Sequence, residues 1–151
     1  MKKISTILVP VDFSDASLEA LDGAIEWAAT LGASVVAMHA YELPVVALFP
    51  EAALVTSMAE LGRHIAETAE TALRGVVEAR ARSGVRVEIV LREGSASEQI
   101  DAVAEEIGAD LIVLGAHAGH RFLRGVTEHV VRTTNRPVLT VHASHASGNR
   151  D

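Results

Sequence analysis

Cysteine is absent from this 151-residue chain, and aromatic side chains make up only 3% of it. Without cysteine the chain has no means to form a disulfide, a thiolate metal site or a cysteine nucleophile. The scarcity of aromatic residues removes the stacking surfaces on which proteins bind single-stranded nucleic acid. It also predicts a core built almost entirely from aliphatic side chains.

Basic residues are too few to balance the acidic ones, with 13 Lys and Arg against 20 Asp and Glu and a net charge of -7. Phosphate backbones and anionic membranes both attract basic surfaces, so we expect neither nucleic acid nor a membrane as a partner. No apolar run approaches the ~20 residues that span a bilayer. The apolar start breaks at Asp12, too early for a signal peptide. These features predict a soluble, cytoplasmic protein.

Signatures of covalent and metal chemistry are missing as well. The chain has no G-x-S-x-G elbow, no P-loop and no Rossmann G-x-G-x-x-G motif, and no serine or threonine has an evident base partner. His117 and His120 are three residues apart, but no carboxylate or cysteine completes a spacing typical of zinc or copper. His39 lies in an apolar run and is predicted to be a hydrogen-bonded core histidine. We predict no catalytic residue and no metal site.

What the sequence does contain is an alternation of apolar, strand-like runs and amphipathic segments with helical periodicity. Strands are predicted for residues 4–13, 34–41, 85–91, 109–115 and 137–141, and helices for residues 14–32, 51–84, 95–108 and 125–134. The second helix is either continuous or interrupted at Gly62. This alternation predicts a single-domain α/β fold, an open parallel sheet with helices on both faces. The domain is expected to span residues 1–142, followed by a flexible polar tail at residues 143–151.

The segment from Leu111 to Val141 is where we expect a binding site. A buried strand ends in Gly115, and a loop rich in glycine and histidine separates it from the next predicted helix. Ligands of open α/β sheets bind at the carboxyl ends of strands, near the point where the strand order reverses. A glycine-bearing loop that opens a helix can also offer backbone N–H groups to a phosphate.

Four blocks of sequence, in order along the chain, closely resemble the universal stress protein family. They are ILVPVDFSDASLEAL at residues 7–21, VVAMHAYE at 35–42, GSASEQIDAVAEEIGADLIVLGAH at 94–117 and EHVVRTTNRPVLTV at 128–141. The resemblance implies a five-stranded sheet of order 3-2-1-4-5, similar to the adenine-nucleotide α-hydrolase fold. It implies ATP or AMP binding in one subgroup, with Mg²⁺ accompanying ATP, and no nucleotide in another. It also implies homodimers that pair their last strands, here the strand from Pro137 to Val141.

The resemblance extends to individual site residues. Family positions that line the adenine and ribose match Pro10, Val11, Asp12 and Ala40. Nucleotide-binding members also carry a Gly, two residues, a second Gly, nine residues, and then Gly followed by Ser or Thr. The corresponding candidates for phosphate contact are Gly115, His117, Gly119, Arg124, Gly125, Val126 and Thr127.

This phosphate motif is shortened and displaced. Gly119 comes one place late, and only five residues separate it from Gly125. Val126 occupies the position of the expected hydroxyl residue, which arrives one step later as Thr127. The sequence therefore predicts a degenerate or altered nucleotide-binding loop.

Several charged residues have two interpretations. Asp12 can accept hydrogen bonds from an adenine or ribose, or it can cap the first helix together with Ser14 and Asp15. Arg121 and Arg124, placed by the prediction in the shortened loop, can contact a phosphate or can be solvated and pair with neighbours such as Glu128.

Two functions follow from these patterns. In the first, the chain is a dimeric stress-response or regulatory module that works through contacts with an unidentified protein, and His120, Arg121 and Phe122 cover the crevice. In the second, it is an ATP- or AMP-binding stress protein with weak or no ATP hydrolysis. We predict the first, because the sequence departs from the motif at the phosphate-binding positions, with slow ATP turnover at most.

Overall fold

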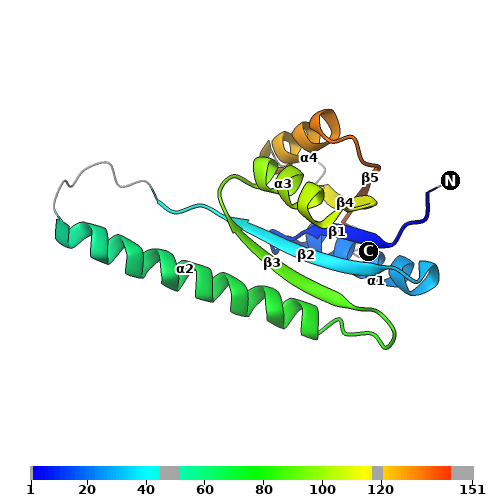
Figure 1. The fold of residues 1–151 in the computed structure, drawn as a ribbon, viewed down its shortest axis with the longest axis horizontal. Helices are drawn as coiled ribbons and strands as arrows, with labels where there is room; N and C mark the ends of the chain where they lie inside the picture. Colours follow the sequence, from blue (N-terminus) through cyan, green and yellow to red (C-terminus); the bar gives the residue numbers. More distant parts are fainter. Residues whose placement is uncertain (1, 45–51, 117–120, 144–151) are drawn as a thin grey trace, which may run out of the picture.

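The computed structural model describes residues 2–44, 52–116 and 121–143. The strands are β1 (Thr6–Pro10), β2 (Ser34–Tyr41), β3 (Val87–Glu93), β4 (Leu111–Ala116) and β5 (Val138–His142), and the helices are α1 (Asp15–Leu31), α2 (Ala52–Glu78), α3 (Ala96–Ile107) and α4 (Arg121–Thr133). All strand pairs are parallel, in the order β3-β2-β1-β4-β5 (Figure 1). The predicted fold class and strand order are confirmed.

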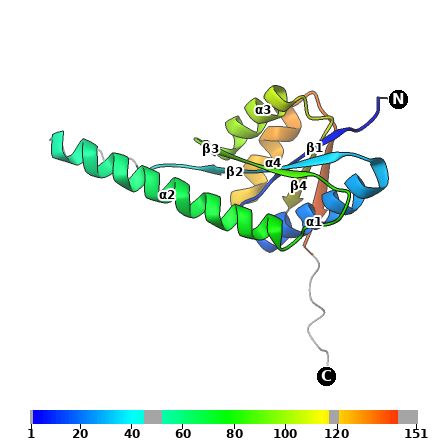
Figure 2. The ribbon, with the colours of Figure 1, turned by 60° about the horizontal axis from the view of Figure 1, so that its bottom comes forward.

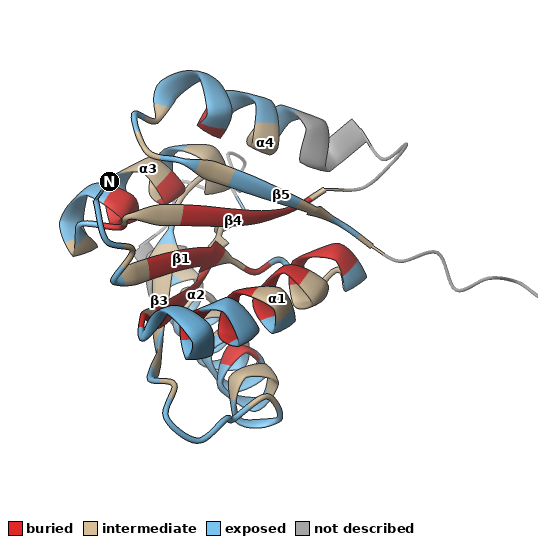
Figure 3. Ribbon diagram, turned by 90° about the vertical axis from the view of Figure 1, so that its right-hand side faces the viewer, coloured by how far each residue is buried: buried red, intermediate tan, exposed pale blue. Residues whose placement is uncertain are grey.

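Two aliphatic cores lie on opposite faces of the sheet, because successive side chains of a strand alternate between faces. Ile7 and Val9 of β1 pack with α1 and with Leu73 of α2. Leu8 points the other way and packs with α3 and with Val130 of α4. Figure 3 shows the middle of the central strands β1 and β4 buried between these helices, whereas β5 at the edge is largely exposed. The helices thus cover both faces, as predicted.

Helix α2 is continuous through Gly62 and ends at Glu78, earlier than predicted. Just after α2, the N–H of Arg80 donates a hydrogen bond to the carbonyl of Val77, and the N–H of Ala81 donates one to the carbonyl of Glu78. Such three-residue hydrogen bonds close a helix. Gly84, predicted as the helix end, instead lies in the turn before β3 with φ of 84°.

Helix α3 begins at Ala96, within one residue of the predicted start at residue 95. Ser95 is the N-cap residue, yet its side chain makes no capping hydrogen bond. Its backbone carbonyl accepts the first helical hydrogen bond, from the N–H of Gln99 at 3.0 Å. The helix is therefore positioned by its buried stripe of Ile100, Val103 and Ala104 rather than by a side-chain cap.

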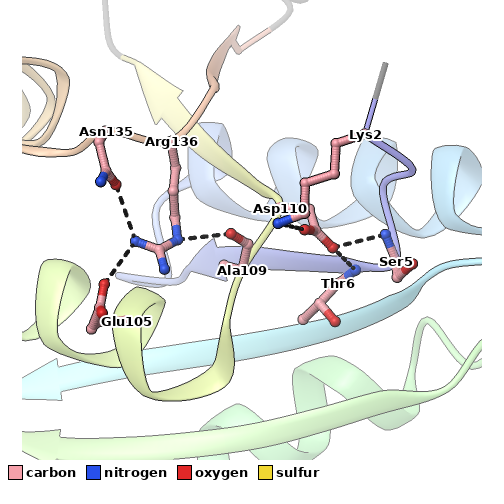
Figure 4. Close-up of polar contacts among 8 residues, drawn as sticks. All are labelled: Lys2, Ser5, Thr6, Glu105, Ala109, Asp110, Asn135 and Arg136. Carbon is pink, nitrogen blue, oxygen red and sulfur yellow. Dashed lines mark hydrogen bonds and ion pairs between the residues drawn. The ribbon is translucent and has the colours of Figure 1, made fainter.

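At the amino ends of the strands, Asp110 joins β4 to the start of β1 (Figure 4). Its Oδ2 accepts hydrogen bonds from the N–H groups of Ser5 at 3.0 Å and Thr6 at 3.1 Å. Its Oδ1 lies 2.9 Å from Nζ of Lys2. Nearby, Nε of Arg136 donates to the carbonyl of Ala109 at 2.7 Å and ties the β5 entry to the same corner.

These contacts make stability depend on the charge of Asp110. The hydrogen bond from Lys2, followed by those from the Ser5 and Thr6 N–H groups, lowers the pKa of Asp110 below its usual value, although burial acts in the opposite direction. Asp110→Asn should therefore lower the free energy of unfolding by about 1–2 kcal/mol at pH 7. This difference should be fully present above about pH 5 and disappear as the pH falls through the lowered pKa. Urea unfolding at pH 7 and pH 3 measures it.

The control for this prediction is Lys2→Met, because the Lys2 side chain is 84% exposed. It should lower the free energy of unfolding by less than Asp110→Asn does, since the hydrogen bonds from the Ser5 and Thr6 N–H groups to Asp110 remain. A destabilisation by Asp110→Asn that is equal at both pH values would contradict the role assigned to the carboxylate charge.

Candidate functional site

The carboxyl ends of β1, β2 and β4 surround a small cavity of about 60 Å³. It lies where the strand order reverses, since β1 has β2 on one side and β4 on the other. Of the predicted site residues, Pro10, Val11, Asp12, Ala40, Gly115 and Val126 line it. The cavity is several-fold smaller than the roughly 300–1,000 Å³ of typical ligand pockets.

Other residues of the cavity wall were missed by the sequence prediction. They are Ser17, Met38, His39, Ala96, Ile100 and Leu114. Most of them are apolar residues of β2, α3 and β4, and periodicity marks such residues only as core. The available signal was position: each lies near the carboxyl end of a strand or near the start of a helix.

Asp12 supports the start of α1. Its Oδ1 accepts hydrogen bonds from the N–H of Ser14, at 3.0 Å, and from the Ser14 hydroxyl. Ser14 is the N-cap residue of α1, and its Oγ accepts from the N–H of Ser17 at 3.3 Å. The capping role weighed in the sequence is therefore present. Asp12 also lines the cavity, so contact with a ligand stays a prediction.

His39 and Phe13 fix the turn between β1 and α1. Nδ1 of His39 lies 2.7 Å from the carbonyl oxygen of Val11. A carbonyl only accepts, so this nitrogen donates, and the predicted hydrogen bond is confirmed. His39 is half-buried near the end of β2, however, and does not belong to the core as predicted. The ring of Phe13 packs against His39 with centroids 4.8 Å apart. Phe13 has φ of 64°, a left-handed conformation that costs a non-glycine residue roughly 1–2 kcal/mol.

Gly115 has a packing role at this edge. A Cβ added there would lie 2.5 Å from the carbonyl carbon of Ala16 and from the backbone nitrogen of Ser17. The first turn of α1 therefore crosses β4 too closely for any side chain at position 115. The glycine predicted to let the backbone approach a phosphate is already required by the contact between α1 and β4.

The predicted helix start at Gly125 is wrong, because α4 begins at Arg121. Arg121 and Arg124 accordingly belong to the helix and not to a loop. Gly125 is exposed inside the helix, and a Cβ there would meet nothing within 4 Å. Its low helix propensity, about 1 kcal/mol below alanine, favoured placing it at a boundary. Burial of Val130, and partial burial of Val126, outweighs that cost.

The longer helix removes donors from the predicted phosphate site. Only the first four N–H groups of an α-helix lack a partner within the helix. In α4, which begins at Arg121, these groups all precede Gly125, so the N–H groups of Gly125, Val126 and Thr127 are used by the helix itself. His117 and Gly119, the remaining predicted residues, lie outside the described part of the chain, as do His120 and the tail from residue 144.

Metal and membrane sites were searched over the same described ranges. Within residues 2–44, 52–116 and 121–143, no group of three or more His, Asp or Glu side chains is arranged to hold a metal ion. Among the helices described, none is both long enough and apolar enough to cross a membrane.

Solved structures with this fold include several universal stress proteins. The structure of protein MJ0577 of Methanocaldococcus jannaschii has a TM-score of 0.77 at 23% identity, with 96% of this chain and 100% of the other covered. UspA of Lactobacillus plantarum has a TM-score of 0.75 at 26% identity, with coverages of 93% and 99%.

Sequence comparison gives the same result. The curated Universal stress protein MJ0531 of Methanocaldococcus jannaschii is 34% identical over 140 residues, which cover 89% of this chain and 80% of the relative. The model of the universal stress protein family matches residues 3–142. The match extends over nearly the whole chain, from before β1 to the end of β5, and the chain belongs to the universal stress protein family.

Proposed function

We propose that this universal stress protein is a dimeric regulatory module that acts through protein contacts and does not hold a nucleotide triphosphate. The observation that carries the proposal is the early start of α4 at Arg121. Only residues 117–120 separate β4 from α4. The N–H groups at positions 125–127, which the family motif would place at the phosphates, are used within the helix.

The dimer is proposed to form through β5. This strand lies at the edge of the sheet and pairs only with β4 in the described structure. Leu139 is 39% exposed on it. An uncovered edge strand presents unpaired backbone groups, and a second copy related by a two-fold axis covers both edges at once.

Leu139→Asp tests this interface. The change would place a carboxylate from each copy in the proposed interface, and charged side chains on an edge strand oppose pairing with another strand. We expect light scattering to show half the wild-type mass for Leu139→Asp. The matched control is Leu31→Asp on α1, because Leu31 is similarly exposed at 43%; it should keep the wild-type mass. An unchanged mass in Leu139→Asp, with a native circular dichroism spectrum, would exclude β5 as the interface.

A second candidate function is binding of a smaller adenine nucleotide. Universal stress proteins of the same fold have been solved with cAMP and, from Arabidopsis thaliana, with AMP. In this chain the support comes from the cavity, which Pro10, Asp12 and Ala40 line. Titration calorimetry with AMP tests it: binding that is lost in the cavity-filling variant Ala40→Leu would establish this function, and absence of binding would eliminate it.

A further inference from the structure

Helix α2 is longer than the part of the sheet that it covers. Its 27 residues extend about 40 Å at 1.5 Å per residue. Figures 1 and 2 show its C-terminal part lying over the sheet while its N-terminal part projects beyond it. Leu73 in the C-terminal part is fully buried. In the projecting part, Leu61 is 40% exposed, and the nearest neighbour of Gly62 from another segment is Leu43.

A second apolar stripe runs along α2, on a face different from the one that holds Leu73. Its members alternate at spacings of three and four residues: Met58, Leu61, Ile65, Thr68 and Ala72. This is the spacing of the contact seam in a pair of coiled helices. Met58 and Ile65 are only half-buried, and the other three are exposed. None of the five residues of the stripe is buried in the described structure.

The side chains of the stripe are large at its N-terminal end and small at its C-terminal end. Met58, Leu61 and Ile65 occupy the projecting part, whereas Thr68 and Ala72 occupy the part above the sheet. Beside the small residues the surface is open and shallow, and it is lined by the exposed residues His64, Glu67, Thr68, Thr71 and Ala72. The helix therefore presents large apolar side chains at one end of the stripe and room beside small side chains at the other.

We propose that α2 is a self-association surface on which two copies pair antiparallel about a two-fold axis near Ile65. Reversing one helix places Leu61 against Thr68 of the second copy and Met58 against Ala72 of the second copy. His64 then lies beside Glu67 of the second copy, which adds a polar contact at the margin. A two-fold pair makes each such contact twice. A parallel pair would instead set large residues against large ones and small residues against small ones.

Helix physics gives an independent reason for a partner. Helices in proteins owe most of their stability to packing of an apolar face, and isolated segments of about 12–15 residues are marginal in water. Within the described ranges, the stripe on the projecting part of α2 is at most half-buried. The surface also lies on the β3 side of the sheet, opposite to β5, so pairing through α2 would join two of the proposed β5 dimers into a tetramer.

Leu61→Asp tests the surface. Placing a charge in the seam should halve the molecular mass measured by light scattering at about 50 µM, whatever the contribution of β5. Because Leu61 is largely exposed, the variant should keep the wild-type circular dichroism spectrum. Leu31→Asp on α1, with 43% exposure, should leave the mass unchanged. Equal masses for wild type and Leu61→Asp would overturn the proposal.

Cross-linking tests the antiparallel register separately. The chain has no cysteine, so a single introduced cysteine reports one position. Ile65→Cys lies near the proposed two-fold axis and should form a covalent dimer under mild oxidation. Arg63→Cys, on the other side of the helix, should form no covalent dimer under the same conditions. Equal cross-linking at both positions would contradict the register, and no cross-linking at Ile65→Cys would exclude it.

Discussion

Replacing Gly115 by alanine is expected to lower the free energy of unfolding by about 3 kcal/mol, among the largest effects of any single methyl group in this chain. The added Cβ would lie 2.5 Å from backbone atoms of Ala16 and Ser17, and backbone cannot rotate away as a side chain can. Either β4 or the first turn of α1 has to move, and overpacking of this kind costs about 1–3 kcal/mol or more. Urea unfolding followed by circular dichroism measures the loss.

Gly125→Ala is the matched control, because it adds the same methyl group at another glycine of the predicted phosphate motif. Nothing lies within 4 Å of that position, and it is inside α4. Alanine should therefore raise the free energy of unfolding, by up to about 1 kcal/mol. A loss of less than about 1 kcal/mol for Gly115→Ala would show that α1 and β4 are not in close contact.

Leu73→Ala should have a comparable effect, about 3 kcal/mol, within the range of roughly 2–5 kcal/mol for truncating a buried leucine. Leu73 is fully buried between α2 and the sheet. Val76 and Val77 are only partly buried beside it. Loss of Leu73 should therefore also loosen α2, and hydrogen exchange of the α2 amides should accelerate more than that of the α3 amides.

Leu61→Ala provides the comparison on the same helix. Leu61 is 40% exposed, so its truncation should cost less than about 1 kcal/mol in dilute protein, where association is negligible. Similar costs for the two variants would mean that Leu73 does not anchor α2 to the sheet.

The fold could be predicted because its signals are local and agree with one another. Residues 34–41 were predicted as a strand and form β2 with those bounds. Ser14 was predicted as a cap, and its side chain does accept a hydrogen bond from Ser17. The two helix boundaries that differ most from the prediction are the end of α2, predicted at Gly84, and the start of α4, predicted at Gly125. In each case hydrogen bonding or burial outweighed the preference of glycine for helix ends.

The site was less predictable because its geometry depends on contacts distant in sequence. Proximity of Pro10, Asp12 and Ala40 follows from the parallel sheet and was predicted. The contact of Gly115 with α1 joins residues about a hundred positions apart, and no local pattern reveals it. Asp12 illustrates the remaining ambiguity, since a capping residue and a ligand-binding residue occupy the same place at the end of β1.

Loss of the phosphate-binding loop is tested most directly by thermal unfolding of the purified chain with and without about 1 mM ATP and Mg²⁺. A ligand at one hundred times its dissociation constant adds about 2.7 kcal/mol of stability, which raises the Tm of a domain of this size by several degrees. We predict a rise of less than about 1 °C with ATP and Mg²⁺. A rise of several degrees would show that the chain still binds the triphosphate, and would contradict the function proposed from the early start of α4.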